Sequence, residues 1–309
     1  PENGGNRLSS VTFGNGMFVT VGNNGTILNS ADGDTWTKQA NAEGDIALNK
    51  VEYLNNSFLV LGETKVLTSA SGENGSWTTY NTQSNATLRG ITYFDGTYVV
   101  VGDGGSILTS DNLNTWTRRD VYSTAGSVVN TDILDVSYGY VGVDTFIALG
   151  VGGKIITSQN MLNWQEGNQT LNNAVGITFA NDHFVAIGPG GDIFSAFGNP
   201  NSWQPVNSGS NKDLNYITHV NGKFIAVGNQ SEIVINTDRI EIHKHKSDVS
   251  LFNLDDDLDV TVDFSSSNTA EATITPATLT FTPAGQKKWD TPQTLTVTGV
   301  NDDDSDGHK

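Results

Sequence analysis

A glycine that follows an apolar residue recurs along this chain at a nearly constant spacing. By subtraction, successive copies lie 40, 40, 48, 38 and 40 residues apart, and a tryptophan follows 14 or 15 residues after each of the first five. The glycines are Gly22, Gly62, Gly102, Gly150, Gly188 and Gly228, and the tryptophans are Trp36, Trp77, Trp116, Trp164 and Trp203. A repeat of about 40–45 residues indicates one supersecondary unit copied along the chain.

Residues 88–116 show what each copy contains. Three β-branched or aromatic runs precede the start of a fourth at Thr115, and the pair Asp95-Gly96 and a glycine-rich stretch at 102–105 separate them. Glycine reaches positive φ without steric cost, so these stretches fit tight turns. Four short strands in each of six copies predict an all-β fold, a six-bladed β-propeller over residues 7–246, in which each sheet covers its neighbours. The recurrent tryptophans are expected to anchor the core between blades.

The net charge is −18, from 34 acidic and 16 basic residues. Such a balance argues against nucleic acid as a partner, because phosphate contacts need a basic surface. No apolar run reaches 18 residues, so no membrane span is predicted. The chain has no cysteine, which excludes a disulfide framework and a thiolate nucleophile.

The turn before Trp36 reads Ser30-Ala31-Asp32-Gly33-Asp34-Thr35-Trp36. In such a hairpin a serine or aspartate side chain binds the turn backbone, and glycine supplies the special dihedral. The stretch resembles the Asp-box of bacterial neuraminidase-type repeats, although the other copies depart from that pattern. The resemblance implies a propeller similar to those of sialidases and of photosystem II assembly factors.

The blade pattern stops near Lys246. Beyond it, Leu258, Val260, Val262 and Phe264 alternate with polar residues, which predicts an antiparallel sheet with one buried face. The stretch 277–307 resembles Calx-β-type modules of bacterial surface and secreted proteins. We therefore expect a small, partial β-sandwich over residues 247–309, and a chain that belongs to a longer or processed protein.

A sialidase-like site would need a cluster of arginines that grips a carboxylate with bidentate geometry. The chain has five arginines, and Arg118 and Arg119 are adjacent on a strand, so they should point to opposite faces. By register, only Arg89 lies on a first, channel-lining strand. No arginine trio, Ser–His–Asp spacing, phosphate loop or zinc motif is evident, and the sequence predicts no enzyme.

A ligand site is predicted instead around the longest connection between blades, residues 118–131. Arg118, Arg119 and Tyr122, with Arg89 at the channel, place rare basic groups beside an aromatic ring. Loops that grow on a rigid scaffold are favoured places for binding, and neutral loop drift is the alternative. This mixture suits an acidic or sugar ligand.

Calcium is the predicted cofactor, at Asp302, Asp303, Asp304 and Asp306, because hard cations take six to eight oxygen ligands. A solvated acidic loop is the alternative. For the earlier group at Asp255–Asp257 and Asp259, that alternative is favoured. The pair His243 and His245 shares one strand face, but a polar rim strand is favoured over a metal site there.

The function predicted from these features is a non-catalytic recognition or adhesion module of a bacterial extracellular or cell-surface protein. A propeller face would bind a glycan or a protein. The open edge of the C-terminal module would allow self-association. The alternatives are a glycan hydrolase of sialidase-like fold and a structural subunit of a surface fibre.

Overall fold

The structure is a computed structural model that describes residues 7–40, 44–220, 223–229 and 233–237, and five strands between residues 246 and 299. The chain divides into two compact units, residues 1–238 and 239–309. In the described part, no helix is long and apolar enough to cross a bilayer.

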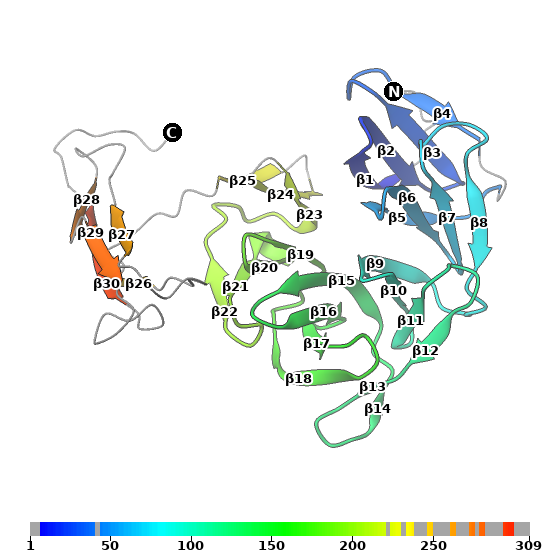
Figure 1. The fold of residues 1–309 in the computed structure, drawn as a ribbon. Helices are drawn as coiled ribbons and strands as arrows, with labels where there is room; N and C mark the ends of the chain where they lie inside the picture. Colours follow the sequence, from blue (N-terminus) through cyan, green and yellow to red (C-terminus); the bar gives the residue numbers. More distant parts are fainter. Residues whose placement is uncertain are drawn as a thin grey trace. The chain divides into compact units, whose positions relative to one another are not determined.

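Unit 1 is a six-bladed β-propeller, as the repeat predicted (Figure 1). Blades 1 and 2 are four-stranded antiparallel sheets of consecutive strands. Their strands are β1 (Leu8–Gly14), β2 (Met17–Gly22), β3 (Thr26–Ser30), β4 (Thr37–Gln39), β5 (Leu48–Leu54), β6 (Ser57–Gly62), β7 (Lys65–Ser69) and β8 (Thr78–Asn81). Blade 3 repeats this order with β9 (Leu88–Phe94), β10 (Thr97–Gly102), β11 (Ser106–Ser110) and β12 (Thr117–Arg119).

Blade 4 is larger because part of the long connection joins its outer edge. Its sheet order is β14-β13-β18-β17-β16-β15, with β13 parallel to β18. The strands are β13 (Val121–Tyr122), β14 (Val128–Val129), β15 (Ile133–Tyr140), β16 (Asp144–Gly150), β17 (Lys154–Ser158) and β18 (Trp164–Thr170). Part of the connection predicted as a loop, Val121–Tyr122 and Val128–Val129, is therefore sheet.

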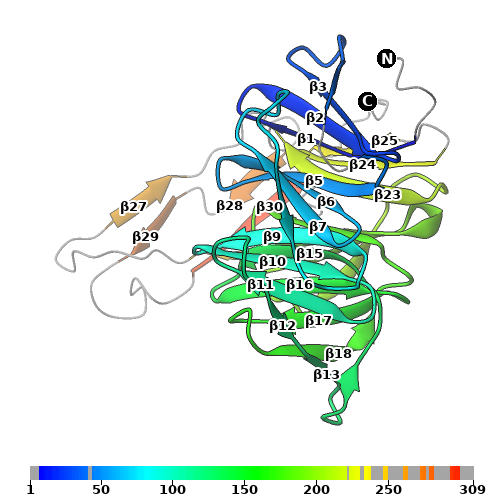
Figure 2. The same cartoon turned by 90° about the vertical axis from the view of Figure 1, so that its right-hand side faces the viewer.

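Blade 5 has four strands, and three are described for blade 6. Blade 5 contains β19 (Gly176–Ala180), β20 (His183–Ile187), the short 3-10 helix η1 (Pro189–Gly191), β21 (Ile193–Phe197) and β22 (Trp203–Val206). Blade 6 contains β23 (Leu214–Val220), β24 (Lys223–Gly228) and β25 (Ile233–Thr237). Figure 2 shows the sheets of blades 1 to 4 packed face against face.

In blades 1, 3 and 6 the repeated glycine is required by a close approach of the backbone. A Cβ on Gly22, Gly102 or Gly228 would overlap the backbone carbonyl oxygen of Arg7, Thr87 or Asp213, respectively. Each of those oxygens belongs to the residue just before the first strand of the same blade. In these three blades only a residue without a side chain fits where the first strand enters, which explains their glycine.

A β-bulge recurs at the start of the first strand in blades 1, 2, 3, 4 and 6. In blade 3, Leu88 and Gly90 pair with the consecutive residues Gly102 and Val101, so Arg89 is the extra residue. A bulge redirects the side chain of its extra residue. The residue that follows the extra residue, such as Gly90 in blade 3, therefore occupies the same register position in each of these five blades.

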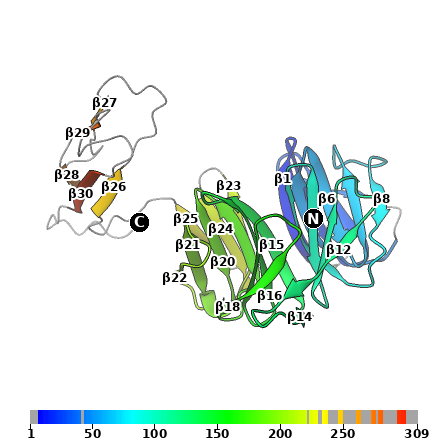
Figure 3. The ribbon, with the colours of Figure 1, turned by 60° about the horizontal axis from the view of Figure 1, so that its bottom comes forward.

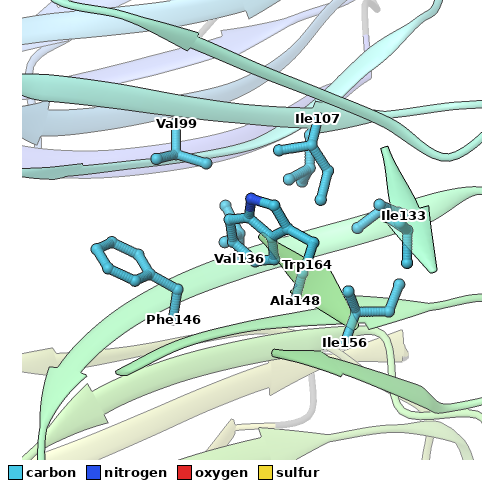
Figure 4. Packing of buried hydrophobic residues seen from close by; sticks show 10 residues of the cluster. Val99, Ile107, Ile133, Val136, Phe146, Ala148, Ile156 and Trp164 are labelled. Carbon is cyan, nitrogen blue, oxygen red and sulfur yellow. The ribbon is translucent and has the colours of Figure 1, made fainter. Parts of the chain in front are cut away.

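The core of unit 1 consists of clusters between neighbouring blades. We call the face of a blade that packs on the next blade its forward face, and the opposite one its rear face. Between blades 3 and 4, Val99, Val101 and Ile107 of the forward face meet a rear face that includes Val136 and Phe146 (Figure 4).

Trp164 is fully buried in this cluster, and Trp77, Trp116 and Trp203 are partly buried against the other clusters. The tryptophans therefore contribute unequally to the core.

The hairpin turn before Trp36 has the expected hydrogen bonds. The Asp32 carboxylate accepts from the backbone N–H groups of Asp34 and Thr35 at 2.9 and 2.8 Å, and Gly33 has a φ of +81°. These bonds lower the pKa of Asp32 to about 2. The indole of Trp36 donates to the carbonyl of Gly33 at 2.9 Å.

Blades 3 and 4 form the same turn with other residues. Asn112 and Asn160 replace the aspartate as acceptors, and Leu113 and Met161 hold the positive φ that Gly33 holds in blade 1. The hydrogen bond of the indole depends more on the spacing between the repeat glycine and the tryptophan than on the identity of the turn residues. The indole nitrogens of Trp77 and Trp203, which follow their glycines by 15 residues, are buried without a partner, whereas the three at 14 donate to a turn carbonyl.

Unit 2 contains five described strands in two sheets. They are β26 (Lys246–Val249), β27 (Val260–Asp263), β28 (Ala272–Thr275), β29 (Thr278–Phe281) and β30 (Gln293–Gly299). One sheet has the order β26-β30-β28, and β27 pairs with β29. All pairs are antiparallel, as the alternating pattern indicates, and the partial sandwich itself stays a prediction.

Candidate functional site

An open pocket of about 620 Å³ lies between blades 2 and 3. It is on the face of the propeller that carries the connections between blades and the turns between second and third strands, which we call the connection face. Residues 82–86 of the β8–β9 connection form one wall. Asp103, Gly104, Ser106, Leu108, Trp116 and Arg118 form the rest.

The wall at residues 82–86 is fixed by its own hydrogen bonds. The Thr82 hydroxyl donates to the carbonyl of Thr64 at 2.7 Å, and the N–H of Gln83 donates to the Asn81 side chain at 2.9 Å. The N–H of Ala86 donates to the Ser84 hydroxyl at 3.1 Å. Local bonds of this kind hold a loop in one conformation, so the polar groups of this wall are positioned in advance.

Arg118 supplies the positive charge of the pocket. Its guanidinium donates to the carbonyl of Gly104 at 3.3 Å and to the Ser106 hydroxyl at 3.5 Å, and it lies 3.8 Å from Asp120. The side chain is half-exposed. An arginine anchored on one side and open to solvent on the other can still form hydrogen bonds to an anionic or polar ligand.

Asp103 supplies a negative charge, and it is paired with Arg89. The Arg89 guanidinium donates to the Asp103 carboxylate, and this hydrogen bond lowers the pKa of Asp103. Because Arg89 is the extra residue of the bulge, it reaches the β10–β11 turn, while Gly90 faces Asp135. Arg89 therefore lies beside the pocket, on the first strand of blade 3 as predicted, and its position at the channel stays a prediction.

The structure separates the other predicted ligand residues from this pocket. The Arg119 guanidinium donates to the Thr109 hydroxyl at 3.0 Å, and Arg119 does not line the pocket. Tyr122 is exposed on β13, at the outer edge of blade 4, opposite Val128. Of the four predicted residues, Arg118 is in the pocket and Arg89 contacts its wall.

The predicted metal ligands lie outside the described residues. These are Asp302, Asp303, Asp304 and Asp306, and the same holds for Asp255–Asp257, Asp259, His243 and His245. Among the residues that the structure describes, no group of three or more acidic or histidine side chains could hold a metal ion.

A second polar cluster, which the sequence did not indicate, lies where residues of four blades meet. The Lys50 ammonium lies 3.3 Å from Asp135, 3.2 Å from Glu52 and 4.8 Å from the ring centre of Tyr216. Asp135 also accepts from the N–H of Ile177 at 3.1 Å. Residues of blades 2, 4, 5 and 6 therefore meet at one point.

One lysine faces two carboxyl groups in this cluster, and burial and charge shift their pKa values. Burial by itself would lower the pKa of Lys50, but the carboxylates of Asp135 and Glu52 outweigh it, so the pKa lies above its usual range. Burial raises the pKa of Glu52, and Lys50 opposes that change. A buried lysine with two carboxylates is a satisfied structural group, and we assign this cluster to holding the ring.

The fold of unit 1 is that of the β-propellers. The chain is similar to Ycf48 bound to a D1 peptide, at a TM-score of 0.56 and 15% identity over 96% of this chain and 92% of that one. It is also similar to a catalytically inactive virginiamycin B lyase from Staphylococcus aureus with quinupristin. That match has a TM-score of 0.61 and 11% identity over 80% of this chain and 89% of the lyase chain. At these identities the likeness shows the fold alone. No protein-family model and no curated protein sequence matches the chain.

Proposed function

We propose that this chain is a non-catalytic recognition module of a bacterial extracellular or cell-surface protein, and that the pocket between blades 2 and 3 binds a glycan. The observation that carries the proposal is the composition of the pocket: the Trp116 ring and Leu108 lie near the half-exposed Arg118 and a wall of fixed amide and hydroxyl groups. Sugars present both apolar ring faces and hydroxyl groups, and such sites recognise both.

The arrangement of the arginines favours binding over hydrolysis. Of the described arginines, only Arg118 lines this pocket, whereas Arg89 is paired with Asp103 and Arg119 is bonded to Thr109. A sialidase-like grip on a substrate carboxylate would need several guanidinium groups together. The hydrolase is therefore the weaker candidate.

A peptide ligand is a second candidate, because a propeller of similar fold, Ycf48, has been solved with a D1 peptide. The resemblance of the C-terminal region to Calx-β modules, and of the blade 1 turn to an Asp-box, supports the surface location. The same resemblance supports calcium at Asp302–Asp304 and Asp306 and self-association of unit 2. A melting transition of unit 2 that is unchanged by chelator would contradict calcium binding.

A glycan array with the purified chain tests the proposal, followed by calorimetric titration of the best ligand. Arg118→Ala should weaken binding at least about tenfold, because hydrogen bonds to a charged group contribute about 1.5–3 kcal/mol. Arg119→Ala is the matched control and should leave affinity unchanged. Equal affinity for the wild type and Arg118→Ala, or binding by a peptide panel without any glycan, would overturn the assignment.

A further inference from the structure

A second open pocket, of about 550 Å³, lies between blades 1 and 2, at the β3–β4 turn of one and the β7–β8 turn of the other. These two blades, at the blue end of the chain, are side by side (Figures 1 and 3). Its walls include Asn29, Asp32 and Gln39 of blade 1 and Glu73 of blade 2. The pocket shares no lining residue with the one between blades 2 and 3, so it is a separate site.

Gln39 is a buried amide in a position that other blades fill differently. It pairs with Ile27 across β3 and β4, and it therefore lies on the forward face of blade 1. The equivalent residues of blades 2 and 5 are Tyr80 and Val206, which pack against the core cluster shared with the next blade. In blade 3 the equivalent residue is Arg119, which is bonded within its own blade. Gln39 is 4% exposed, so blade 1 buries a polar group at this position.

The neighbours of Gln39 fix the direction of its amide. Asn29 Nδ2 donates to the carbonyl of Gly72 at 3.1 Å, which leaves Asn29 Oδ1 as an acceptor. Gln39 Nε2 donates to that oxygen at 2.8 Å and to the carbonyl of Thr37 at 3.0 Å. Both amide hydrogens are therefore used, and Gln39 Oε1 has no hydrogen-bond partner among the described residues. Because buried acceptors are normally paired, this oxygen indicates a donor that enters from the pocket.

Two carboxylates lie at the same pocket. Asp32 Oδ1 accepts from the N–H groups of Thr35 and Asp34 at 2.8 and 2.9 Å and from the Ser30 hydroxyl at 2.9 Å. These bonds lower the pKa of Asp32 to about 2, so the group is charged at neutral pH, and they leave Oδ2 for a ligand. The Glu73 side chain is exposed, and its carboxylate forms no hydrogen bond or ion pair with a described residue. No described basic residue lines the pocket to compensate the two charges.

This set of acceptors suits an organic cation better than a metal ion. A hard metal ion takes six to eight oxygen ligands, and among the described residues no group of three acidic or histidine side chains could hold one. A guanidinium carries five N–H donors in one plane and is weakly hydrated, so it can bond to several acceptors at once. An ammonium is more compact and more strongly hydrated.

We propose that this pocket binds the guanidinium group of an arginine side chain carried by a peptide segment of a partner. Asp32 Oδ2 and the Glu73 carboxylate supply the negative charge, and Gln39 Oε1 supplies the neutral acceptor at the base. The volume of about 550 Å³ leaves room for the peptide beside the guanidinium, where Thr37 and Asn74 offer hydroxyl and amide groups to its backbone. The net charge of −18 draws a basic segment toward the chain.

Calorimetric titration of the full chain at low salt tests the proposal with three probes. These are acetyl-arginine amide, acetyl-citrulline amide, and the pentapeptide acetyl-Gly-Gly-Arg-Gly-Gly amide. Citrulline has nearly the shape of arginine without its charge, so it should bind at least about tenfold more weakly. The pentapeptide should bind at least as tightly as acetyl-arginine amide. In NMR spectra, the side-chain amide signal of Gln39 should shift on addition of either arginine probe.

Asp32→Asn is the most informative variant, because asparagine forms the same turn in blades 3 and 4 and only the charge is lost. Asp32→Asn and Glu73→Gln should each weaken binding of acetyl-arginine amide at least about tenfold. Asp34→Asn is the matched control: it removes the same charge two residues away, from an exposed residue that does not line the pocket. It should leave the affinity unchanged. Melting temperatures confirm beforehand that all three variants are folded.

The contrary outcomes are distinct from one another. Equal binding of citrulline and arginine would show that no cation is recognised. An equal loss in Asp34→Asn and Asp32→Asn would mean that only the overall negative charge attracts the probe. Binding of acetyl-arginine amide without binding of the pentapeptide would replace the peptide by a small guanidino compound and contradict the proposed source. An unchanged Gln39 signal at saturation would place the cation elsewhere on the chain.

Discussion

The ammonium of Lys50 in blade 2 lies 3.3 Å from the carboxylate of Asp135 in blade 4, and 85 residues separate them in sequence. Both side chains are largely buried, and Glu52 is the second anion within reach of the lysine. Removing one partner of a buried ion pair is costly because the charge that remains has no compensation. The pair therefore links the local folding of two blades to the closure of the ring.

Lys50→Met should destabilise unit 1 by about 3–5 kcal/mol, the usual cost of an unpaired buried charge. Lys154→Met is the control, because Lys154 pairs with Glu166 at 2.9 Å but is more exposed, and such pairs contribute about 0–1 kcal/mol. Urea denaturation followed by tryptophan fluorescence measures both. Similar losses in the two variants would show that Lys50 is not a buried link.

Gly102→Ala should destabilise the chain more than Gly104→Ala. A methyl group at Gly102 would overlap the carbonyl oxygen of Thr87, which is backbone and cannot turn away. At Gly104 the added methyl meets open space, and the cost is that of a positive φ, about 1 kcal/mol. Thermal melting of the two variants gives the comparison, and an equal shift would contradict the steric explanation of the repeat.

Trp164→Ala should cost about 3–5 kcal/mol, since Trp164 is fully buried between blades 3 and 4. Trp36→Ala should cost clearly less, because Trp36 is only partly buried and contacts Phe18 at 6.4 Å between ring centres. Chemical denaturation measures the difference. Equal penalties would mean that position in the repeat, rather than burial, sets the contribution of each tryptophan.

Asp32→Asn should preserve the blade 1 turn at neutral pH, because Asn112 and Asn160 make the same bonds in blades 3 and 4. The folded pKa of Asp32, about 2, lies below the ordinary 3.8. A depressed carboxyl pKa stabilises above pH 3.8 and loses that contribution as the pH falls toward 2. Melting temperatures between pH 5 and pH 2 should therefore fall less steeply for Asp32→Asn than for the wild type, and parallel profiles would contradict this.

Local patterns predicted the blades well. The apolar-glycine repeat and the turn pairs located all six sheets, since strand pairing within a blade is between neighbours in sequence. The turn of blade 1 was also predictable, because Ser30, Asp32 and Gly33 act within a few residues. The equivalent turns at Asn112 and Asn160 were harder to predict, because leucine and methionine occupy the position of the glycine.

Features that depend on register or on contacts between distant residues could not be predicted from the sequence. Arg89 is the extra residue of a bulge and pairs with Asp103 of the next turn, and alternation alone cannot reveal a bulge. The central cluster combines residues of different blades that no local pattern connects. The stretch containing Tyr122 gave no strand signal, yet it pairs with the edge of blade 4.

The consecutive strand order of the blades has a consequence for synthesis of the chain. Each sheet consists mainly of strands that follow one another directly, so a blade can form soon after its own residues leave the ribosome. The forward face of a blade can be buried only after the next roughly 40 residues, which form the rear face of the following blade, have been synthesised. Assembly should therefore proceed from blade 1 onward, and Lys50 gains Asp135 as its second carboxylate only after blade 4 has emerged.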